Sequence, residues 1–431
     1  MNVRDSEAIA ALLTQRGYAL AASEDEADAI LLNTCSVRDL SEQKALGKMS
    51  ALAGRKRAKP SLRLGFLGCM AQSRGAELRK NLPAVDLIVG TQRFHHVPDY
   101  LDQLFARHDA IVDVTEETGS ESTVKDHVAT GAVTAFVSVM QGCDMRCTFC
   151  IVPQTRGAER SRGIAEIAEE VRALTATGVR DVMLLGQNVT SYGRGVIAKK
   201  NGKSPFVQLL EALHDVKDLE RIRFTSPHPK GFGDDLVAAH RDLPRLCEHA
   251  HLPLQSGSDR ILKTMQRGYD RATFMRIIEK LRAAQPKIVF SSDIIVGFPG
   301  ETDEDFEATA SVMRETPFEH AYIFKYSKRR GTPAAMMNDQ APTTVKESRH
   351  RRLLDLLSEI ATRRHREMIG QTVEVLVEGP SPKNKSRLFG RTRTNNGVVF
   401  SGDARLRGAL LRVKIDETTA TTLYGSLTEN L

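Results

Sequence analysis

Short apolar runs alternate with stretches of helical period along most of this chain, and the alternation divides it into three parts. In residues 1–107, three runs are typical of buried parallel strands: Ala27–Asn33, Leu62–Leu67 and Val85–Val89. A helical pattern from Asp5 to about Gln15 precedes them. Strands that alternate with helices predict a doubly wound βα domain, here with its first strand missing.

The second part, residues 131–368, carries six apolar runs with helical patterns between most of them. The runs lie near residues 134–140, 181–185, 221–225, 250–254, 287–295 and 319–325. Repeated βα units of this number predict an incomplete TIM-type (β/α)6 barrel, with its chemistry at the carboxyl ends of the strands. Residues 108–130 are polar around Glu116–His127 and are expected to link the two domains.

The third part, residues 369–431, alternates with the period of β-strands. It follows a long helix, Val345–Met368, whose arginines are interspersed with acidic residues and fit an ordinary solvated helix as well as a basic surface. Short strands with basic loops predict a small OB-like β-barrel, a shape often used to bind RNA. Its expected RNA-binding residues are Arg387, Arg391 and Arg393.

Composition narrows the possible classes of protein. The chain has 431 residues, a net charge of +7 and a pI near 9.1, so an anionic partner is modestly favoured. No apolar run approaches the length of a membrane span. Six cysteines in a chain of this length suit a reducing cytoplasm better than a disulfide scaffold. We therefore expect a cytoplasmic protein that is monomeric and has no membrane partner.

Three cysteines lie in one short loop directly after the run at residues 134–140. Cys143, Cys147 and Cys150 have the spacing Cys-x3-Cys-x2-Cys. Three thiolates can hold three irons of a [4Fe–4S] cluster and leave the fourth iron open to substrate or cofactor, as a catalytic site requires. Structural zinc is the main alternative, although zinc sites usually have a second pair of ligands and none follows here; coincidence is the other alternative.

The cysteine loop resembles the cluster motif of radical S-adenosylmethionine (SAM) enzymes, and Ile151–Arg162 is similar to the methylthiotransferases among them. Later motifs follow the order of that family: Gly186–Asn188, Arg223–Pro229, His251–Asp259, Ser292–Glu301 and the TRAM-like segment Phe389–Asn396. The resemblance runs from Met1 to the C-terminus. It is closest to the branch that acts on dimethylallyladenosine in tRNA.

The resemblance implies methylthiolation of C2 of N6-(dimethylallyl)adenosine at position 37, in the anticodon loop of tRNA. That carbon–hydrogen bond is not acidic enough for a side-chain base, so a cofactor must supply one-electron chemistry. One SAM at the loop cluster would be the radical source and another the methyl donor, with a reductase of flavodoxin type as electron donor. Gly186 and Gln187 are expected near the methionyl amine of SAM, and Asp293 and Gly297 near its adenosine. Arg156 is expected either near SAM or a substrate phosphate or as an ordinary surface group at the start of a helix.

Two further cysteines, Cys35 and Cys69, end successive strands, where doubly wound sheets bind ligands. The resemblance implies that they hold an auxiliary [4Fe–4S] cluster that carries the sulfur. The family has a third cysteine, two residues before the position of Met1. We therefore interpret the sequence as beginning late, without a central first strand, which would leave backbone groups of the neighbouring strands unpaired. The alternative is a variant with a two-cysteine or absent auxiliary cluster.

Other functions stay open at this point. The same reaction on threonylcarbamoyladenosine tRNA, or on an aspartate of a ribosomal protein, is a close rival, although a basic tail suits RNA better. A non-catalytic iron–sulfur or zinc RNA-binding module would explain the cysteines and the tail, but not the motifs at the strand ends. His228 and His251 lie in matched motifs where a histidine is as often structural as functional. Cys247 has no partner at metal-ligand spacing and fits a buried structural thiol.

Overall fold

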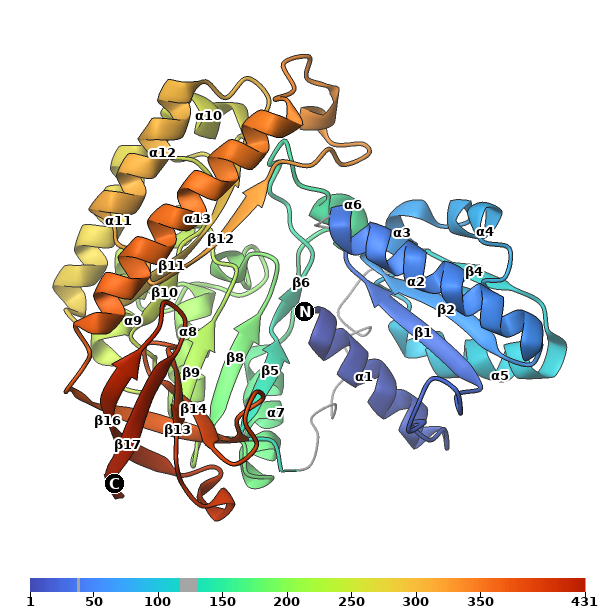
Figure 1. Ribbon diagram of the computed structural model, residues 1–431, viewed down its shortest axis with the longest axis horizontal. Coiled ribbons are helices and arrows are strands. Elements are labelled where there is room, and N and C mark those ends of the chain that lie inside the picture. Colours follow the sequence, from blue (N-terminus) through green and yellow to red (C-terminus); the bar gives the residue numbers. More distant parts are fainter. Residues whose placement is uncertain (37–38, 117–130, 431) are drawn as a thin grey trace. The chain divides into compact units, whose positions relative to one another are not determined.

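The computed structural model describes residues 1–36, 39–116 and 131–430. The chain forms two compact units, whose elements are labelled in Figure 1. The first unit combines Met1–Ala129, Met140–Arg162 and Arg329–Thr332, and the second combines Thr130–Val139, Gly163–Lys328 and Pro333–Leu431. The cysteine loop therefore belongs to the same unit as the N-terminal sheet, although it follows the first barrel strand along the chain.

The first unit is built on a parallel four-stranded sheet. Its strands lie side by side in chain order: β1 (Ala29–Thr34), β2 (Arg63–Gly68), β3 (Leu87–Val89) and β4 (Ile111–Asp113). The three strands predicted from the apolar runs are confirmed. β4 falls in the stretch predicted as a linker, residues 108–130, and residues 117–130 of that stretch lie outside the described part of the chain. The sheet therefore extends beyond residue 107, where the domain was expected to end.

The first two strands of this sheet pair directly with each other. Their register runs from Ala29 opposite Arg63 to Thr34 opposite Gly68. The expectation that backbone groups beside a missing strand stay unpaired is therefore wrong for this structure, because each of the two strands satisfies the other. The sheet is continuous where the sequence pattern suggested a gap.

Helices cover both faces of the sheet, which confirms the doubly wound arrangement. They are α1 (Asn2–Gln15), α2 (Asp39–Ala58), α3 (Cys69–Arg74), α4 (Glu77–Asn81), η1 (Phe94–His96) and α5 (Val97–Arg107). Leu67 of β2 packs in one core with Ile9 of α1 and Leu101 of α5. Its chain neighbour Phe66 points to the opposite face, as successive strand residues do, and packs with Met49 of α2. The unit also contains β6 (Met140–Gln141), α6 (Val152–Arg156) and β7 (Arg160–Ser161).

The second unit contains six parallel strands in two three-stranded sheets, with a parallel bridge between Ile222 and Leu246. They are β5 (Thr134–Ser138), β8 (Asp181–Leu185), β9 (Arg221–Phe224), β10 (His249–His251), β11 (Val289–Val296) and β12 (His320–Lys325). Each corresponds to one predicted apolar run. Between and after them lie α7 (Ile164–Ala176), η2 (Val189–Ser191), α8 (Pro205–His214), η3 (Pro229–Gly231), α9 (Asp234–Asp242), α10 (Asp259–Thr264), α11 (Arg271–Ala284), α12 (Asp303–Glu315) and η4 (Pro333–Met336). The predicted incomplete (β/α)6 barrel is confirmed.

The C-terminal part of the second unit is a long helix followed by a closed five-stranded barrel. These elements are α13 (Thr343–Arg366), β13 (Thr372–Pro380), β14 (Leu388–Thr392), β15 (Gly397–Phe400), η5 (Ala404–Leu406), β16 (Leu410–Thr418) and β17 (Leu423–Asn430). The strands close in the order β13-β14-β15-β17-β16 around a core that includes Val375, Phe400 and Val413. The small C-terminal barrel predicted from the strand period is therefore confirmed. Within the described residues, no helix combines the length and the apolar character that a membrane span requires.

Candidate functional site

The cysteine loop is closed at its base by the antiparallel pair β6 and β7. Gly142 follows β6 with a φ of +78°, and a Cβ on it would lie 1.9 Å from the carbonyl oxygen of Ala158. Only glycine fits here, because the obstructing atom is backbone. The N–H of Cys143 then donates to the carbonyl oxygen of Gly157 at 3.1 Å. The first cysteine therefore starts from a fixed backbone position.

The three thiols of this loop suit a metal cluster. Cys143 and Cys147 are buried and Cys150 is partly exposed, so the donors are shielded. Burial raises the pKa of Cys143 to about 11, against the opposing hydrogen bond from the N–H of Met145. Metal binding must therefore displace its proton, because the thiolate is the ligand. In the part of the chain that the structure describes, no three His, Cys, Asp or Glu side chains are grouped so as to hold a metal ion, the three cysteines of this loop included.

Arg156, the last residue of α6, attaches the cysteine loop to the N-terminal sheet domain. Its Nη2 lies 2.6 Å from Oδ2 of Asp5 in α1, and the two side chains are 4% and 3% exposed. Burial alone would lower the pKa of Arg156, but the charges of Asp5 and Cys69 outweigh it and raise the pKa. Beside it, Oγ1 of Thr91 donates to the carbonyl oxygen of Thr155 at 2.5 Å. The contact between Arg156 and SAM or a substrate phosphate, which the sequence predicted, is not among these contacts.

The strand-end cysteines lie at one edge of the N-terminal sheet. Cys35 and Cys69 each follow the last residue of β1 or β2, and these two residues are opposite each other in the sheet. Cys69 is buried and Cys35 is partly exposed. The amino group of Met1 lies within electrostatic reach of Cys35, and burial is the main cause that lowers the pKa of this amine. One unit therefore holds both sets of cysteines, with Arg156 of the loop beside Cys69.

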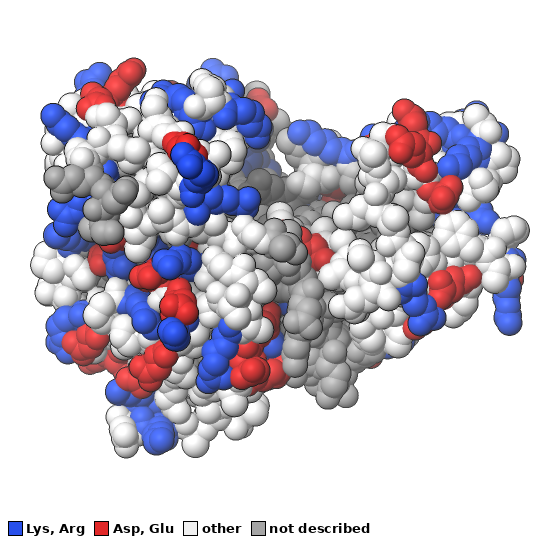
Figure 2. All heavy atoms as spheres, turned by 90° about the horizontal axis from the view of Figure 1, so that it is seen from below, with Lys and Arg blue, Asp and Glu red and all other residues white. Residues whose placement is uncertain are grey.

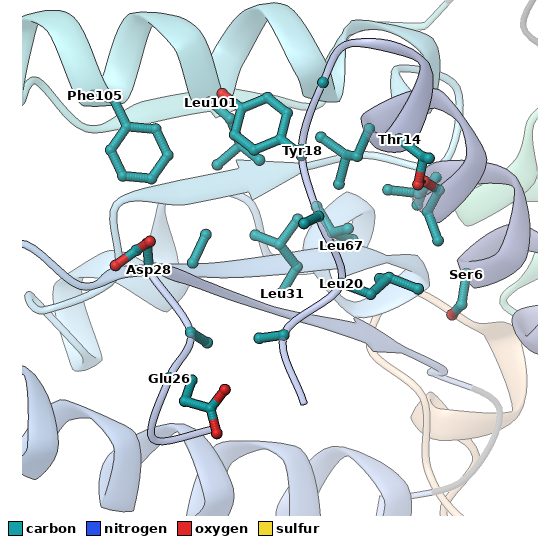
Figure 3. Close-up of a pocket in the computed structure, with 18 of the residues that line it drawn as sticks. Ser6, Thr14, Tyr18, Leu20, Glu26, Asp28, Leu31, Leu67, Leu101 and Phe105 are labelled. Carbon is teal, nitrogen blue, oxygen red and sulfur yellow. The ribbon is translucent and has the colours of Figure 1, made fainter. Parts of the chain in front are cut away.

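A cavity of 1040 Å³ opens beside α1 in the same unit (Figure 3). Its lining is largely apolar and includes Leu31, Leu67, Leu101 and Phe105. No cysteine lines it. This cavity is therefore distinct from the edge of the sheet at which Cys35 and Cys69 lie.

The residues predicted to contact SAM lie in the second unit. Gly186 and Gln187 follow β8, and Gly297 follows β11, so these three lie at carboxyl ends of barrel strands. The N–H of Gly297 donates to Oε2 of Glu301 at 2.6 Å. Asp293 lies inside β11 rather than at its end. The strand ends are the positions at which TIM-type folds bind ligands, and the contacts with SAM themselves stay predictions.

The two histidines of the matched motifs differ in their surroundings. His251 is bonded on both ring nitrogens, with Nε2 3.2 Å from Oδ2 of Asp293 and Nδ1 2.9 Å from Oγ of Ser291. Burial, followed by nearby cations, lowers the pKa of His228 to about 3, so its ring is neutral near pH 7. Cys247 is buried, as its lack of a spaced partner predicts. His251 thus belongs to the internal packing, whereas His228 has unused hydrogen-bonding capacity.

The three arginines predicted to bind RNA are engaged differently. Arg393 pairs with Glu248 through Nε at 2.7 Å, and its Nη2 donates to the carbonyl oxygen of Pro244. Arg391 pairs with Glu378 at 2.8 Å and is 42% exposed. Arg387 lies over the ring of Tyr424. On the face in Figure 2, Lys and Arg are interspersed with Asp and Glu rather than gathered in one patch. Arg393 therefore holds the C-terminal barrel on the larger one, and contacts of Arg387 and Arg391 with RNA stay predictions.

Two buried arginines of β9, Arg221 and Arg223, complete this attachment. Sequence analysis gives neither of them a role, although Arg223 begins a matched motif. Arg221 donates from Nη1 to the carbonyl oxygen of Arg391 at 2.6 Å. Arg223 donates to the carbonyl oxygens of Thr392 and Arg393 at 2.8 and 2.9 Å. The signal for them is present in the sequence: two arginines at i and i+2 of an apolar run lie on the same face of a strand. A buried face with two charges must meet acceptors, and here these are the backbone carbonyls together with the carboxylates of Glu374, at 2.7 Å from Arg221, and Asp181, at 2.8 Å from Arg223.

Comparison with known proteins assigns a family to each part of this architecture. Residues 137–313 match the Radical SAM superfamily, residues 1–90 match the Uncharacterized protein family UPF0004, and residues 366–428 match the TRAM domain. The structure of the radical SAM methyltransferase TsrM from Kitasatospora setae is similar with a TM-score of 0.55 at 13% identity, covering 78% of this chain and 72% of that one. At this identity the likeness shows the fold alone.

Full-length relatives define the family more narrowly. The tRNA-2-methylthio-N(6)-dimethylallyladenosine synthase of Opitutus terrae is 52% identical over 99% of this chain and 95% of its own length. Its namesake from Methylacidiphilum infernorum is 51% identical over 99% and 92%. The radical SAM match implies a [4Fe–4S] cluster and SAM as cofactors, and the shielded thiols of the cysteine loop fit such a cluster. The chain belongs to the family of tRNA-2-methylthio-N(6)-dimethylallyladenosine synthases.

Proposed function

We propose that this protein replaces the hydrogen on C2 of N6-(dimethylallyl)adenosine, at position 37 of tRNA, with a methylthio group. The names of relatives about half identical over nearly the whole chain support this substrate. The observation that carries the proposal is the composition of the first unit, where the cysteine loop and the strand-end cysteines belong to one fold and Arg156 lies beside Cys69. A reaction that joins radical chemistry to sulfur insertion needs both sets of thiols.

Each set of cysteines has its own role in this proposal. Cys143, Cys147 and Cys150 would hold a [4Fe–4S] cluster to which SAM would bind. With SAM bound, this cluster supplies the one-electron chemistry that takes the hydrogen from C2. Cys35 and Cys69 would be two of the ligands of an auxiliary cluster that carries the sulfur, whose third cysteine ligand is absent from this sequence. A second SAM would provide the methyl group.

The second unit supplies the binding residues. Gly186, Gln187, Asp293 and Gly297 contact SAM at the barrel. Arg387 and Arg391 contact phosphates of tRNA, and Arg393 keeps the C-terminal barrel in position for them. The proposed domains are an N-terminal domain that runs from residue 1 through β4 (Ile111–Asp113), a barrel domain at residues 131–368 and a C-terminal domain at residues 369–431. We further propose that the protein is cytoplasmic and monomeric and takes electrons from a reductase of flavodoxin type.

The proposal is tested by nucleoside mass spectrometry of tRNA from a strain without its own enzyme, complemented with this chain. Wild-type protein should produce the 2-methylthio derivative of dimethylallyladenosine. Cys147→Ala should abolish the product and reductive SAM cleavage, whereas Cys247→Ala, which alters a buried thiol outside both sets, should retain them. A methylthio group found only on threonylcarbamoyladenosine or on a ribosomal protein, or SAM cleavage retained by Cys147→Ala, would contradict the proposal.

A further inference from the structure

Loops that follow three successive barrel strands are joined at their carboxyl ends. The N–H of His228, after β9, donates to Oγ1 of Thr190, after β8, at 3.0 Å, and this hydroxyl lies 3.2 Å from the carbonyl oxygen of His228. Gly231 packs so closely on the same residue that a Cβ there would lie 2.3 Å from Cβ of Thr190. The loop that carries His228 is thus held in one place.

The segment between α10 and α11, which follows β10 along the chain, encloses the other side of His228. The ring of Tyr269 stands edge-on to the His228 ring, with centroids 5.5 Å apart. Arg267 is buried and its Nε lies 3.3 Å from the hydroxyl of Tyr269. Nζ of Lys230 lies 3.8 Å from the Cβ position of Gly268. Two cationic side chains from different loops therefore lie around this histidine.

His228 presents one unused hydrogen-bond donor to this place. The N–H of Lys230 donates to Nδ1 of His228 at 3.2 Å, which assigns the proton of the neutral ring to Nε2. The residue is 6% exposed, and its Nε2 has no hydrogen-bond partner among the described residues. A buried donor without an acceptor costs about 1–3 kcal/mol. The energetic penalty is removed when a ligand supplies the acceptor.

The charges around His228 indicate what kind of acceptor this is. After burial, the causes that lower its pKa are the cations Arg267, Lys230 and Arg194, and no acidic group is a cause among the residues that the structure describes. A neutral donor in a positive field favours an oxyanion. Ser226, two residues earlier, has a φ of +57°, a conformation that non-glycine residues keep where the surrounding structure enforces it, often at ligand sites.

We propose that His228, Lys230 and Arg267 bind a phosphate group of the substrate RNA close to the nucleotide that is modified. The inference rests on the proposed function and specifies where the barrel holds its tRNA. The three loops follow β8, β9 and β10, and the loop after β8 also contains Gly186 and Gln187. A phosphate bound here lies at the same ends of the strands as the SAM contacts proposed for those residues, so it belongs to the anticodon loop rather than to a distant arm of the tRNA.

The test measures binding of a synthetic anticodon stem–loop RNA that contains dimethylallyladenosine, and of copies in which one phosphate at a time is a neutral methylphosphonate. Replacing one particular phosphate near position 37 by methylphosphonate should weaken binding to wild-type protein. The same replacement should not weaken binding to Lys230→Met, because that variant has already lost its contact with this phosphate. Lys230→Met should also reduce the salt dependence of binding by a slope of about one. Lys217→Met, at an exposed lysine that precedes β9, is the matched control and should behave as wild type.

Variants of the histidine separate hydrogen bonding from folding. His228→Phe should weaken RNA binding about tenfold, and His228→Asn, which keeps a donor, should restore part of the loss. SAM affinity should be unchanged in both. The inference is overturned if every methylphosphonate that weakens binding to wild-type protein weakens binding to Lys230→Met equally. It is also overturned if the variants lose affinity for SAM instead of RNA, because the site would then bind the SAM carboxylate. If wild-type protein does not bind the RNA at all, the proposed function fails as well.

Discussion

Arg156 and Asp5 form an ion pair that is almost completely buried, with Nη2 2.6 Å from Oδ2. The pair joins the segment after the cysteine loop to the first helix of the N-terminal domain. Breaking a buried pair by removing one partner costs about 3–5 kcal/mol, because the other charge stays buried. We therefore expect Arg156→Met to loosen α6 and α1 together, as measured by hydrogen exchange of their amides.

A double variant distinguishes this ion pair from simple packing. Arg156→Met with Asp5→Asn should regain part of the protection lost in either single variant. Arg16→Met, which removes an exposed pair with Asp99 in the same unit, should leave this protection almost unchanged, because exposed ion pairs contribute little to stability. Equal effects of Arg156→Met and Arg16→Met would show that the buried pair does not hold the loop.

The arginines of the C-terminal barrel should divide into two classes. Arg387→Ala and Arg391→Ala should each reduce the salt dependence of tRNA binding by a slope of about one, if each contacts one phosphate. Arg393→Ala should leave this slope unchanged and lower the stability of the second unit, because it leaves Glu248 half-buried without its partner. Binding as a function of salt, with urea unfolding of each variant, checks both expectations. An equal reduction of the salt dependence of tRNA binding in all three variants would contradict this division into arginines that bind RNA and an arginine that holds the barrel.

The second unit should lose stability as the pH falls below neutral. Burial lowers the pKa of His228 to about 3 and of His240 to about 4, below the value near 6.5 of the unfolded chain. The unfolded state therefore binds more protons, and stability present above pH 6.5 is lost as the pH falls toward 4, by up to about 1.4 kcal/mol per pH unit for each group. Urea unfolding at about pH 7.5 and about pH 5 measures this. His240→Phe should reduce the difference in unfolding free energy between the two pH values. An unchanged difference in that variant would contradict the assignment of part of the pH dependence to His240.

The sequence pattern predicts most of the fold because, in each of the two barrels, the same local hydrophobic pattern recurs at successive strands. Each of the six apolar runs between residues 134 and 325 corresponds to a strand, and the period of two after residue 371 corresponds to the closed barrel. The pairing of β1 with β2 is not predictable in this way, because strand order depends on contacts distant in sequence. The short strand β4 has only three residues, so its apolar period is too weak to stand out from a polar stretch.

The candidate site was predictable as far as its residues are grouped along the chain. Cys143, Cys147 and Cys150 stand out through spacing alone. The position of Arg156 beside Asp5 was not predictable, since it joins residues 151 positions apart. Arg393 has the composition of an RNA-binding residue, yet its ion pair with Glu248 and its bonds to backbone carbonyls depend on how two barrels pack. Charge identifies possible partners, and only packing decides between RNA and protein.

The central claim is that the hydrogen removed comes from C2 of dimethylallyladenosine in tRNA. It is tested most directly with tRNA that carries deuterium at that carbon, incubated with the reconstituted protein, SAM and a reductant. We predict that deuterium appears in 5′-deoxyadenosine and that the same nucleoside gains a methylthio group. Deuterium that stays on the adenine while 5′-deoxyadenosine accumulates would contradict the account.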